Sequence, residues 1–368
     1  MRKIMYLCPV DWQWIKQRPQ FLAEELSSYY DVHAVYPYSN KRKGLQKSRN
    51  TSVPLIPFYS LPTLGGKLQL CIKINAYLSK LQMRIIYNKL QPDVIWLTMP
   101  WQIDFFPKKL SCKLVYDCMD DYSAITLDRK CVDDLTIKEA ELLSKASLIF
   151  ASSGNLKSLL VKRYKLSEEK ISLLRNGYSG KWHTESVPKR IHSNMSNDTF
   201  KIGYFGTVGR WFDFQLLIDS LSINQQVEYH VWGPLESGIT FPKHDRLFYR
   251  GVLEHHHIQQ YASEMDALVM PFIVNEIVLS VDPVKLYEYI SMGKNILCIQ
   301  YPEVKRFEPF VFFYNTADEY IEQLNAVMQS RDTKYSHQDA VNFLSDNSWE
   351  TRARQVLYLI NAMFENRE

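Results

Sequence analysis

The chain of 368 residues is long enough for two domains of about 150 residues each, and its 46% hydrophobic and 23% charged residues are ordinary for a globular protein. The net charge of +4 permits contact with anionic lipid or a nucleotide, but it is far from the strongly basic balance of a nucleic-acid binder. No apolar run approaches the roughly 20 residues of a membrane-spanning helix. The first apolar run ends at Pro9, too early for a signal peptide, and the six cysteines lack paired-ligand spacing. We therefore expect a cytoplasmic protein with reduced thiols.

The first half of the chain alternates short apolar runs with helical patterns. Continuous apolar strands separated by helices indicate a parallel sheet that is covered on both faces. The expected strands are 4–8, 32–35, 94–97, 114–116, 148–151 and 171–174, and the expected helices are 19–29, 67–90, 133–145 and 155–164. The polar segment 186–198 then marks a domain boundary.

A second alternating series follows, and it predicts a second domain of the same type. Its expected strands are 201–205, 228–232, 247–250, 267–272 and 296–299, and its expected helices are 212–221, 258–263 and 283–292, the last after an irregular piece, 273–281. A helix at 349–364 has apolar residues at helical spacing and is expected to pack back across the domains. We predict an α/β protein with domains 1–180 and 181–347 and a C-terminal helix in 348–368. Two Rossmann-like halves facing each other would place their ligands in a central cleft.

A glycine-spaced turn follows the first strand of the second domain. Gly206, Thr207 and Arg210 lie in the run from Gly203, where glycines let the backbone approach a phosphate and Arg210 adds a permanent charge. This pattern predicts a pyrophosphate site, and the alternative is a plain tight turn. The dinucleotide pattern G-x-G-x-x-G is absent, so NAD and FAD are not expected.

A second anion site is predicted where a helix begins at Pro283. A strand that leads through a loop to a helix N-terminus directs unpaired N–H groups at a ligand. Lys285 and Glu288 share one helical face there, and a carboxylate suits paired sugar hydroxyls better than phosphate. The alternative is an exposed ion pair without a ligand.

Three carboxylates follow the strand at 114–116. Asp117, Asp120 and Asp121 could serve base chemistry, bind a divalent ion or cap a helix. We favour contacts with an acceptor hydroxyl over a metal, because no second carboxylate group has metal-like spacing. Further candidates for that side follow the first strand, although structural packing explains them equally well; these are Asp11, Trp12 and Arg18.

Two basic features invite other interpretations. The triplet 255–257 is all histidine, but consecutive residues cannot share one helical face, which disfavours a metal site. Within 67–90, Lys73, Lys80 and Arg84 share a helical face, opposite an apolar stripe that includes Leu70, Tyr77, Leu78, Leu81 and Ile85. With the basic segment 41–49, this face could rest on an anionic membrane, and the alternative is a solvated face.

Together these motifs resemble the GT-B glycosyltransferases of the large retaining family 4 type, in particular the bacterial branch with teichuronic acid and capsular polysaccharide transferases. The resemblance covers nearly the whole chain. The matching residues are Asp11-Trp12, Arg18-Pro19-Gln20, Tyr116 to Tyr122, Gly203 to Gly206, Trp232 to Leu235, Pro283 to Tyr289, Met292-Gly293-Lys294 and Ser348-Trp349-Glu350.

The resemblance implies a retaining, metal-independent sugar transfer from a nucleotide sugar, with no cofactor. A UDP-sugar is the first expectation for the donor, and a GDP-sugar is the second. Glu288 would hold the ribose, Arg210 the diphosphate and Val252 the base. The turn that contains Pro283, Lys285 and Leu286 would lie against the donor phosphate and sugar. Two positions depart from the family pattern: Ser280 replaces the first glutamate of E-x7-E, and the basic residue that often follows the turn arginine is missing.

In catalysis, Arg210 and Lys285 would stabilise the leaving diphosphate, while Asp117 or Asp120 orients the acceptor. The acceptor would be a glycan or lipid-linked glycan of bacterial surface polysaccharide synthesis, reached at the inner face of the plasma membrane. Two alternatives remain open: a nucleotide-sugar 2-epimerase of the same fold and a non-catalytic glycan-binding scaffold.

Overall fold

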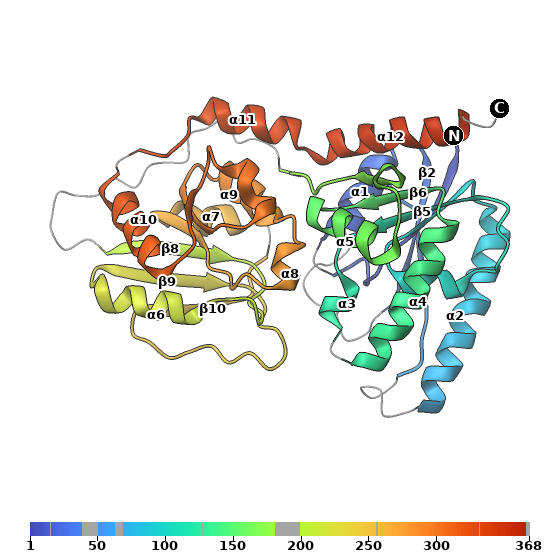
Figure 1. The fold of residues 1–368 in the computed structure, drawn as a ribbon, viewed down its shortest axis with the longest axis horizontal. Coiled ribbons are helices and arrows are strands. Elements are labelled where there is room, and N and C mark those ends of the chain that lie inside the picture. The colour runs from blue at the N-terminus through green and yellow to red at the C-terminus, as the bar shows by residue number, and fades with distance from the viewer. Residues whose placement is uncertain are drawn as a thin grey trace. The chain divides into compact units, whose positions relative to one another are not determined.

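The computed structural model describes residues 1–14, 16–38, 51–62, 69–126, 128–180, 199–254, 257–330 and 332–365. They form two compact units, each of which is described by itself (Figure 1). Unit 1 comprises Met1–Asn176 with Trp349–Glu368, and unit 2 comprises Gly177–Ser348. The segment 186–198, expected to mark the domain boundary, lies outside the described residues.

The described part of unit 1 is built on a parallel sheet in the order β3-β2-β1-β4-β5-β6-β7. Its strands are β1 (Lys3–Leu7), β2 (Asp31–Pro37), β3 (Leu55–Phe58), β4 (Val94–Leu97), β5 (Lys113–Cys118), β6 (Leu148–Ala151) and β7 (Ile171–Leu173). Its helical segments are α1 (Arg18–Leu26), α2 (Gln69–Leu90), η2 (Pro100–Phe105), α3 (Tyr122–Ile125), α4 (Arg129–Lys145), α5 (Gly154–Tyr164), η3 (Glu168–Lys170) and α12 (Trp349–Glu365).

Both faces of this sheet are buried, which explains why its strands are continuous apolar runs. In β1, Ile4 and Tyr6 join the cluster that contains residues of α1 and α12. Met5 and Leu7 point to the other face and join residues of α2, α4 and α5. Helices therefore cover the sheet on both sides.

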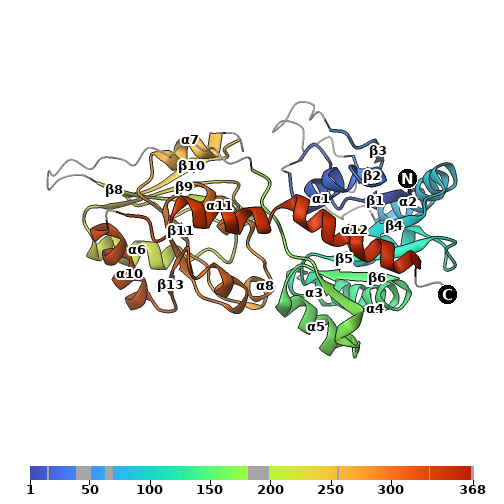
Figure 2. The ribbon, with the colours of Figure 1, turned by 90° about the horizontal axis from the view of Figure 1, so that it is seen from above.

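The last helix belongs to unit 1. Trp349 is 1% exposed and stacks on Phe21 of α1 with ring centroids 5.6 Å apart. At the other end of α12, the Arg2 guanidinium lies 4.3 Å from the centre of the Phe364 ring. Figure 2 shows α12 lying along α1, so the apolar stripe predicted for this helix faces the N-terminal residues of the chain.

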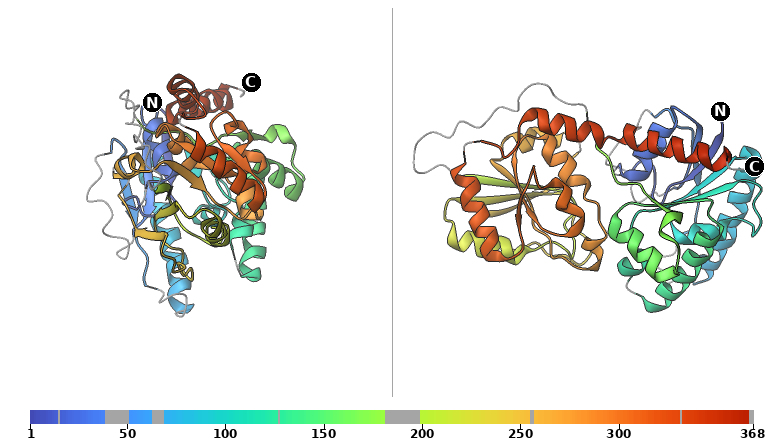
Figure 3. Two further views of the ribbon diagram at one scale, coloured as in Figure 1. Left: turned by 90° about the vertical axis from the view of Figure 1, so that its left-hand side faces the viewer. Right: turned by 45° about the horizontal axis from the view of Figure 1, so that its top comes forward.

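The described part of unit 2 holds a second parallel sheet, in the order β10-β9-β8-β11-β12-β13, with helices on both faces (Figure 3). Its strands are β8 (Phe200–Phe205), β9 (Val227–Trp232), β10 (Leu247–Gly251), β11 (Ala267–Met270), β12 (Asn295–Ile299) and β13 (Phe312–Tyr314). Its helical segments are α6 (Phe214–Ile223), α7 (Ile258–Ser263), α8 (Glu276–Leu279), α9 (Val284–Ser291), η5 (Pro302–Phe307), α10 (Ala317–Gln329) and α11 (His337–Asp346). Because β8 lies inside the sheet and all its neighbours run parallel, the loops after β8, β9 and β11 emerge at one edge.

Several elements differ from the sequence prediction. The piece expected to be irregular, 273–281, contains α8, which the Asn275 side chain caps through the N–H groups of Ile277 and Val278. Pro283 is the N-cap of α9 and not its first helical residue. The short strands β3 and β13 and the helices α10 and α11 were not predicted, and no described helix is long and apolar enough to cross a membrane.

Candidate active site

The turn after β8 depends on two glycines. Gly206 has φ +151°, and its carbonyl oxygen would lie 1.9 Å from a Cβ built on Gly233. The Gly206 N–H donates to the Trp232 carbonyl at 2.8 Å, so the ends of β8 and β9 are in close contact. A side chain at Gly233 would separate them.

The Lys285 side chain lies directly over this turn. A Cβ built on Gly206 would meet Lys285 Cε at 1.8 Å and Nζ at 2.7 Å. The ammonium lies 5.7 Å from the centre of the Tyr204 ring and 5.9 Å from that of Phe272. Burial lowers the pKa of Lys285, and the Glu288 carboxylate opposes that change. The structure therefore brings together Gly206, Lys285 and Glu288, which sequence analysis had assigned to one donor site.

Backbone donors are available in the turn after β8 and at the start of α9. The N–H groups of Thr207 and Gly209 have no hydrogen-bond partner among the described residues, and neither have those of Val284 and Lys285 at the start of α9. Tyr204 donates to the Thr207 carbonyl at 2.7 Å, which holds the turn in place. Unpaired N–H groups in a turn and at a helix start suit an anion.

Tyr289 fixes the relation between α9 and β8, a role that sequence analysis did not assign to it. Its hydroxyl accepts a hydrogen bond from the Phe205 N–H at 2.9 Å and lies 3.4 Å from the Phe205 carbonyl oxygen. The side chain is fully buried. The run Leu286 to Tyr289 contains two tyrosines, but sequence alone could not show which of them reaches β8.

Arg210 is exposed, and it lies beside a carboxylate that sequence analysis missed. The Arg210 N–H donates to Glu236 Oε2 at 3.1 Å. Glu236 comes from the loop after β9, 26 residues away in sequence, so no local pattern could have revealed it. A negative group at this point makes Lys285 the better placed of the two predicted phosphate-binding cations.

The remaining donor-side residues vary in accessibility. Leu286 is 0% exposed, so only its backbone can face a ligand, and Pro283 is also buried. Val252, in the loop after β10, is 47% exposed. Glu288 is half-buried on α9, one turn beyond Lys285.

Asp282, just before α9, is held by an arginine that the sequence did not single out. Arg306 of η5 forms an ion pair with the Asp282 carboxylate, which is 0% exposed, and also donates to the Tyr287 hydroxyl at 2.7 Å. A buried carboxylate needs such a partner. The Arg306 pair thus fixes the turn that leads into the Lys285 helix.

In unit 1 the three predicted aspartates have different environments. Asp117 is 0% exposed and pairs with Arg18, whose Nε and Nη2 donate at 3.1 and 2.7 Å. Arg18 Nη1 also donates to Asn176 Oδ1 at 3.1 Å. Sequence analysis had placed Arg18 and Asp117 at one site, and the structure joins them in a buried ion pair.

Asp121 pairs with Arg163 through bonds of 2.9 and 2.8 Å and caps α3 by accepting from the Ser123 N–H. No described residue donates a hydrogen bond to the Asp120 side chain, which is half-buried. Burial raises the pKa of Asp120 to about 6; the Arg18 charge lowers it and Asp121 raises it further. Of the three carboxylates, Asp120 is the one without an ion pair among the described residues.

The loop after β1 is more buried than a binding loop would be. Asp11 is 5% exposed and accepts from the Gln13 N–H at 2.9 Å, and Trp12 is 1% exposed. These contacts suit a structural role for Trp12. Two residues of the histidine triplet, His255 and His256, lie outside the described residues.

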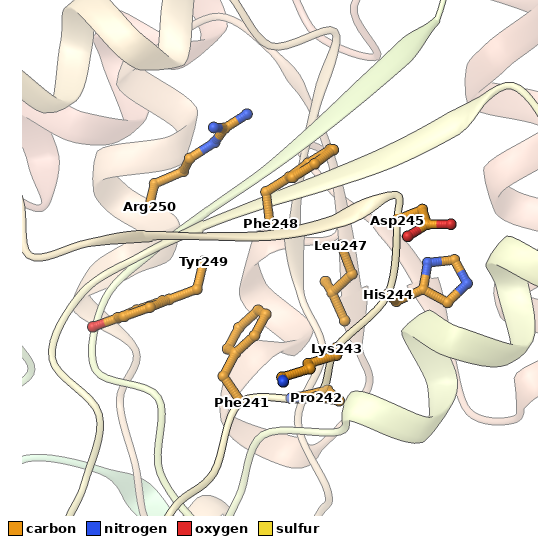
Figure 4. A pocket seen from close by; sticks show the side chains of 9 residues that line it. All are labelled: Phe241, Pro242, Lys243, His244, Asp245, Leu247, Phe248, Tyr249 and Arg250. Atoms are coloured by element: carbon orange, nitrogen blue, oxygen red, sulfur yellow. The ribbon is translucent and has the colours of Figure 1, made fainter.

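A cavity of about 440 Å³ lies elsewhere in unit 2, lined by residues 241–245 and 247–250 (Figure 4). It contains none of the predicted site residues. The lysine and the arginine that line it, Lys243 and Arg250, lie on opposite sides of β10 in Figure 4, so they cannot bind one anion together. The turns after β8 and before α9 are therefore the better candidate for donor binding.

Comparison with known proteins gives the class. The chain is similar in fold to sucrose-phosphate synthase from Thermosynechococcus elongatus, with a TM-score of 0.73 at 13% identity over 99% of this chain and 100% of that one. It is also similar to Anabaena HepE in complex with UDP and glucose, with a TM-score of 0.69 at 15% identity over 98% and 100% of the two chains. The expected GT-B fold of two Rossmann-like domains is confirmed.

One curated protein relates the chain to a narrower group. It is 22% identical over 284 residues to the putative teichuronic acid biosynthesis glycosyltransferase TuaH of Bacillus subtilis, covering 72% of this chain and 70% of that protein. No protein-family model matches the chain. The resemblance to bacterial glycosyltransferases, stated from the motifs, is thereby confirmed, since this relative is named a glycosyltransferase and the first structural neighbour a sucrose-phosphate synthase.

Proposed function

We propose that this protein is a retaining, metal-independent glycosyltransferase that uses a nucleotide-sugar donor. The observation that carries the proposal is the Lys285 ammonium lying over Gly206, in a turn that has N–H groups without a partner among the described residues. A diphosphate needs positive charge and N–H donors, and this cluster supplies both without a metal. Glu288, on the same face of α9, would accept hydrogen bonds from the ribose hydroxyls. Val252 would contact the base, and Arg210 would assist Lys285 with the diphosphate.

In the reaction that we propose, the bond between the anomeric carbon and the donor diphosphate breaks and the acceptor oxygen takes its place on the same face of the sugar. The acceptor proton passes to the leaving diphosphate, whose charge Lys285 stabilises. Asp120 orients the acceptor hydroxyl, because it is the predicted carboxylate that is free of a strong ion pair. Asp117 acts indirectly, by fixing Arg18.

We propose UDP as the nucleotide, since HepE was solved with UDP and with UDP-glucose. The acceptor that we propose is a glycan or lipid-linked glycan of a cell-surface polysaccharide, as the name of the TuaH relative suggests. Such an acceptor would bring the protein to the inner face of the plasma membrane, where an anionic surface can meet Lys73, Lys80 and Arg84.

The test is a transfer assay with a panel of UDP-sugars and GDP-sugars and lipid extracts as acceptors, each reaction run with and without EDTA. We expect transfer from one donor, with the anomeric configuration of the donor kept in the product by NMR. Inversion would contradict the retaining mechanism, and loss of activity in EDTA would contradict metal independence. An epimerised free sugar nucleotide without acceptor would identify the epimerase instead.

A further inference from the structure

The outward side of α2 is apolar. Five of the six large apolar residues that are exposed in the described part of α2 share one face and are called the α2 stripe: Leu70 (71% exposed), Ile74 (37%), Tyr77 (68%), Leu81 (43%) and Ile85 (58%). The sixth, Ile72 (39%), lies on another side of the helix. Spacings of three and four residues place the stripe residues on one helical face. The opposite face carries Met83 and Ser79, which are 0% and 7% exposed and pack into unit 1. A surface helix normally turns its polar face to water, so the α2 stripe needs a partner.

The chain after β3 extends this surface. The Gln82 side chain accepts from the Tyr59 N–H and donates to the Tyr59 carbonyl, both at 2.9 Å. Asn75 does the same for Leu61, at 2.7 and 2.9 Å. Tyr59 is 55% exposed and Leu61 is 43% exposed. Four hydrogen bonds thus hold two further apolar side chains along the flank of the helix.

The charges on α2 are of one sign. Its 22 residues include no Asp or Glu, and Lys73, Lys80 and Arg84 are all exposed. Lys80 lies three residues after Tyr77, and Arg84 lies three after Leu81, so these basic residues flank the α2 stripe. Sequence analysis had instead placed them on the opposite side of the helix. An exposed apolar stripe beside a purely basic flank is complementary to a surface that is apolar below and anionic above.

We infer that α2 lies flat on an anionic lipid membrane, with the α2 stripe inserted among the acyl chains and the basic flank on the headgroups. At about 1.5 Å per residue the stripe would run along roughly 22 Å of the surface. In Figure 1, α2 lies along the outer margin of unit 1, and the side chains of the α2 stripe are exposed. Membrane binding by α2 would bring the protein to a lipid-linked acceptor, and this link to the acceptor rests on the proposed function.

A second copy of the chain fits the same stripe less well. Pairing two α2 helices would bring their basic residues together without an acidic residue on α2 to neutralise them. The basic segment 41–49, which sequence analysis joined to this face, lies outside the described residues and is not needed here.

The test is flotation of the full chain with vesicles of neutral phosphatidylcholine or of a mixture with 30% phosphatidylglycerol, a composition that we choose to give about the anionic charge of a bacterial membrane. We expect binding to the anionic vesicles. The triple variant Tyr77→Gln, Leu81→Gln, Ile85→Gln keeps helix propensity and charge, so its binding should fall at least tenfold at low and high salt. The variant Lys73→Gln, Lys80→Gln, Arg84→Gln should bind about a hundredfold more weakly at low salt, at roughly fivefold per charge.

A matched control replaces exposed apolar residues elsewhere: Ile137→Gln, Ile223→Gln and Tyr358→Gln, which are 68%, 63% and 74% exposed. It should bind vesicles like the unmodified protein. The inference would be overturned if the α2 stripe variant bound vesicles as strongly as the control variant. It would also be overturned if sedimentation showed that the unmodified protein is a dimer and the α2 stripe variant a monomer. Thermal stabilisation by UDP, measured in the same variant, reports on the proposed function separately, because the α2 stripe lies in unit 1 and the predicted donor residues lie in unit 2.

Discussion

Asp120 combines a half-buried carboxylate with the absence of a hydrogen-bond donor among the described residues, whereas Asp117 and Asp121 each pair with an arginine. Its pKa is raised from 3.8 to about 6, so between these pH values the folded protein holds this proton more strongly than the unfolded chain does. Stability is therefore lost as the pH rises from about 4 through 6, and the loss persists above that range.

Asp120→Asn removes this cost. We expect the variant to be more stable than the unmodified protein above pH 6, by at most about 3 kcal/mol, with no difference below pH 4. Urea unfolding of the variant and of the unmodified protein, at pH 8 and at pH 4, measures the two stability differences. Transfer activity should fall at least tenfold, and the acidic limb near pH 6 in the unmodified enzyme should disappear. A variant with full activity would remove Asp120 from the mechanism.

Gly206 offers a test of Lys285 that leaves the lysine in place. A Cβ at Gly206 would occupy the position of Lys285 Cε, so Gly206→Ala must displace the ammonium. We expect UDP binding to weaken at least tenfold, by calorimetry. Gly238→Ala is the control, because Gly238 also has a positive φ of +89° but has no neighbour within 4 Å of an added Cβ. Both variants should lose about 1–2 kcal/mol of stability through backbone strain, and equal UDP affinity in the two would contradict the role of Lys285.

At the scale of elements, the Arg18–Asp117 pair joins the start of α1 to the end of β5. Asp117→Asn would leave the Arg18 guanidinium, which is 5% exposed, without its counter-charge. We expect a loss of about 3–5 kcal/mol in the free energy of unfolding, by urea titration. Glu350→Gln is the control: its pair with Arg354 is 57% and 63% exposed, so the change should stay within about 1 kcal/mol. Equal losses would show that the buried pair does not stabilise the α1–β5 contact.

This pair also shows how far the sequence could predict the site. The residues Arg18 and Asp117 were identified as candidates, because each follows a strand of a parallel sheet. Their contact spans 99 positions and gives the predicted acceptor-side residue Asp117 an ionic partner within the protein. Which arginine pairs with which carboxylate of the cluster depends on tertiary packing, and no local sequence pattern encodes it.

Interior strands that are apolar throughout were predicted well. β4 (Val94–Leu97) and β6 (Leu148–Ala151) have the predicted bounds, because both faces of their sheet are buried and every residue must be apolar. β3 (Leu55–Phe58) was missed: it lies at the sheet edge, is half-buried and contains Pro57, which is tolerated there. α8 has only four residues, too few to show a helical period.

At the scale of the whole molecule, the described residues divide into two units with different chemistry. Unit 2 holds Lys285 over the glycine turn, and unit 1 holds the aspartates after β5 and the α2 stripe. This division agrees with the proposal that one unit binds the donor and the other the acceptor. The sequence predicted two α/β domains, but the return of α12 to unit 1 could only be suggested, since an amphipathic pattern does not name its partner.

The most direct test of the central claim is a thermal-shift measurement of the full chain with UDP, GDP, ADP and CMP in the presence of EDTA. A ligand that binds the folded protein alone raises its apparent stability, by about 2.7 kcal/mol at a hundredfold excess over Kd. We predict a shift with UDP that is lost in Lys285→Gln and Glu288→Gln and kept in the control Gly238→Ala. If no nucleotide shifts the protein at millimolar concentration, the donor site that we propose is wrong and a non-catalytic glycan-binding role becomes the better account.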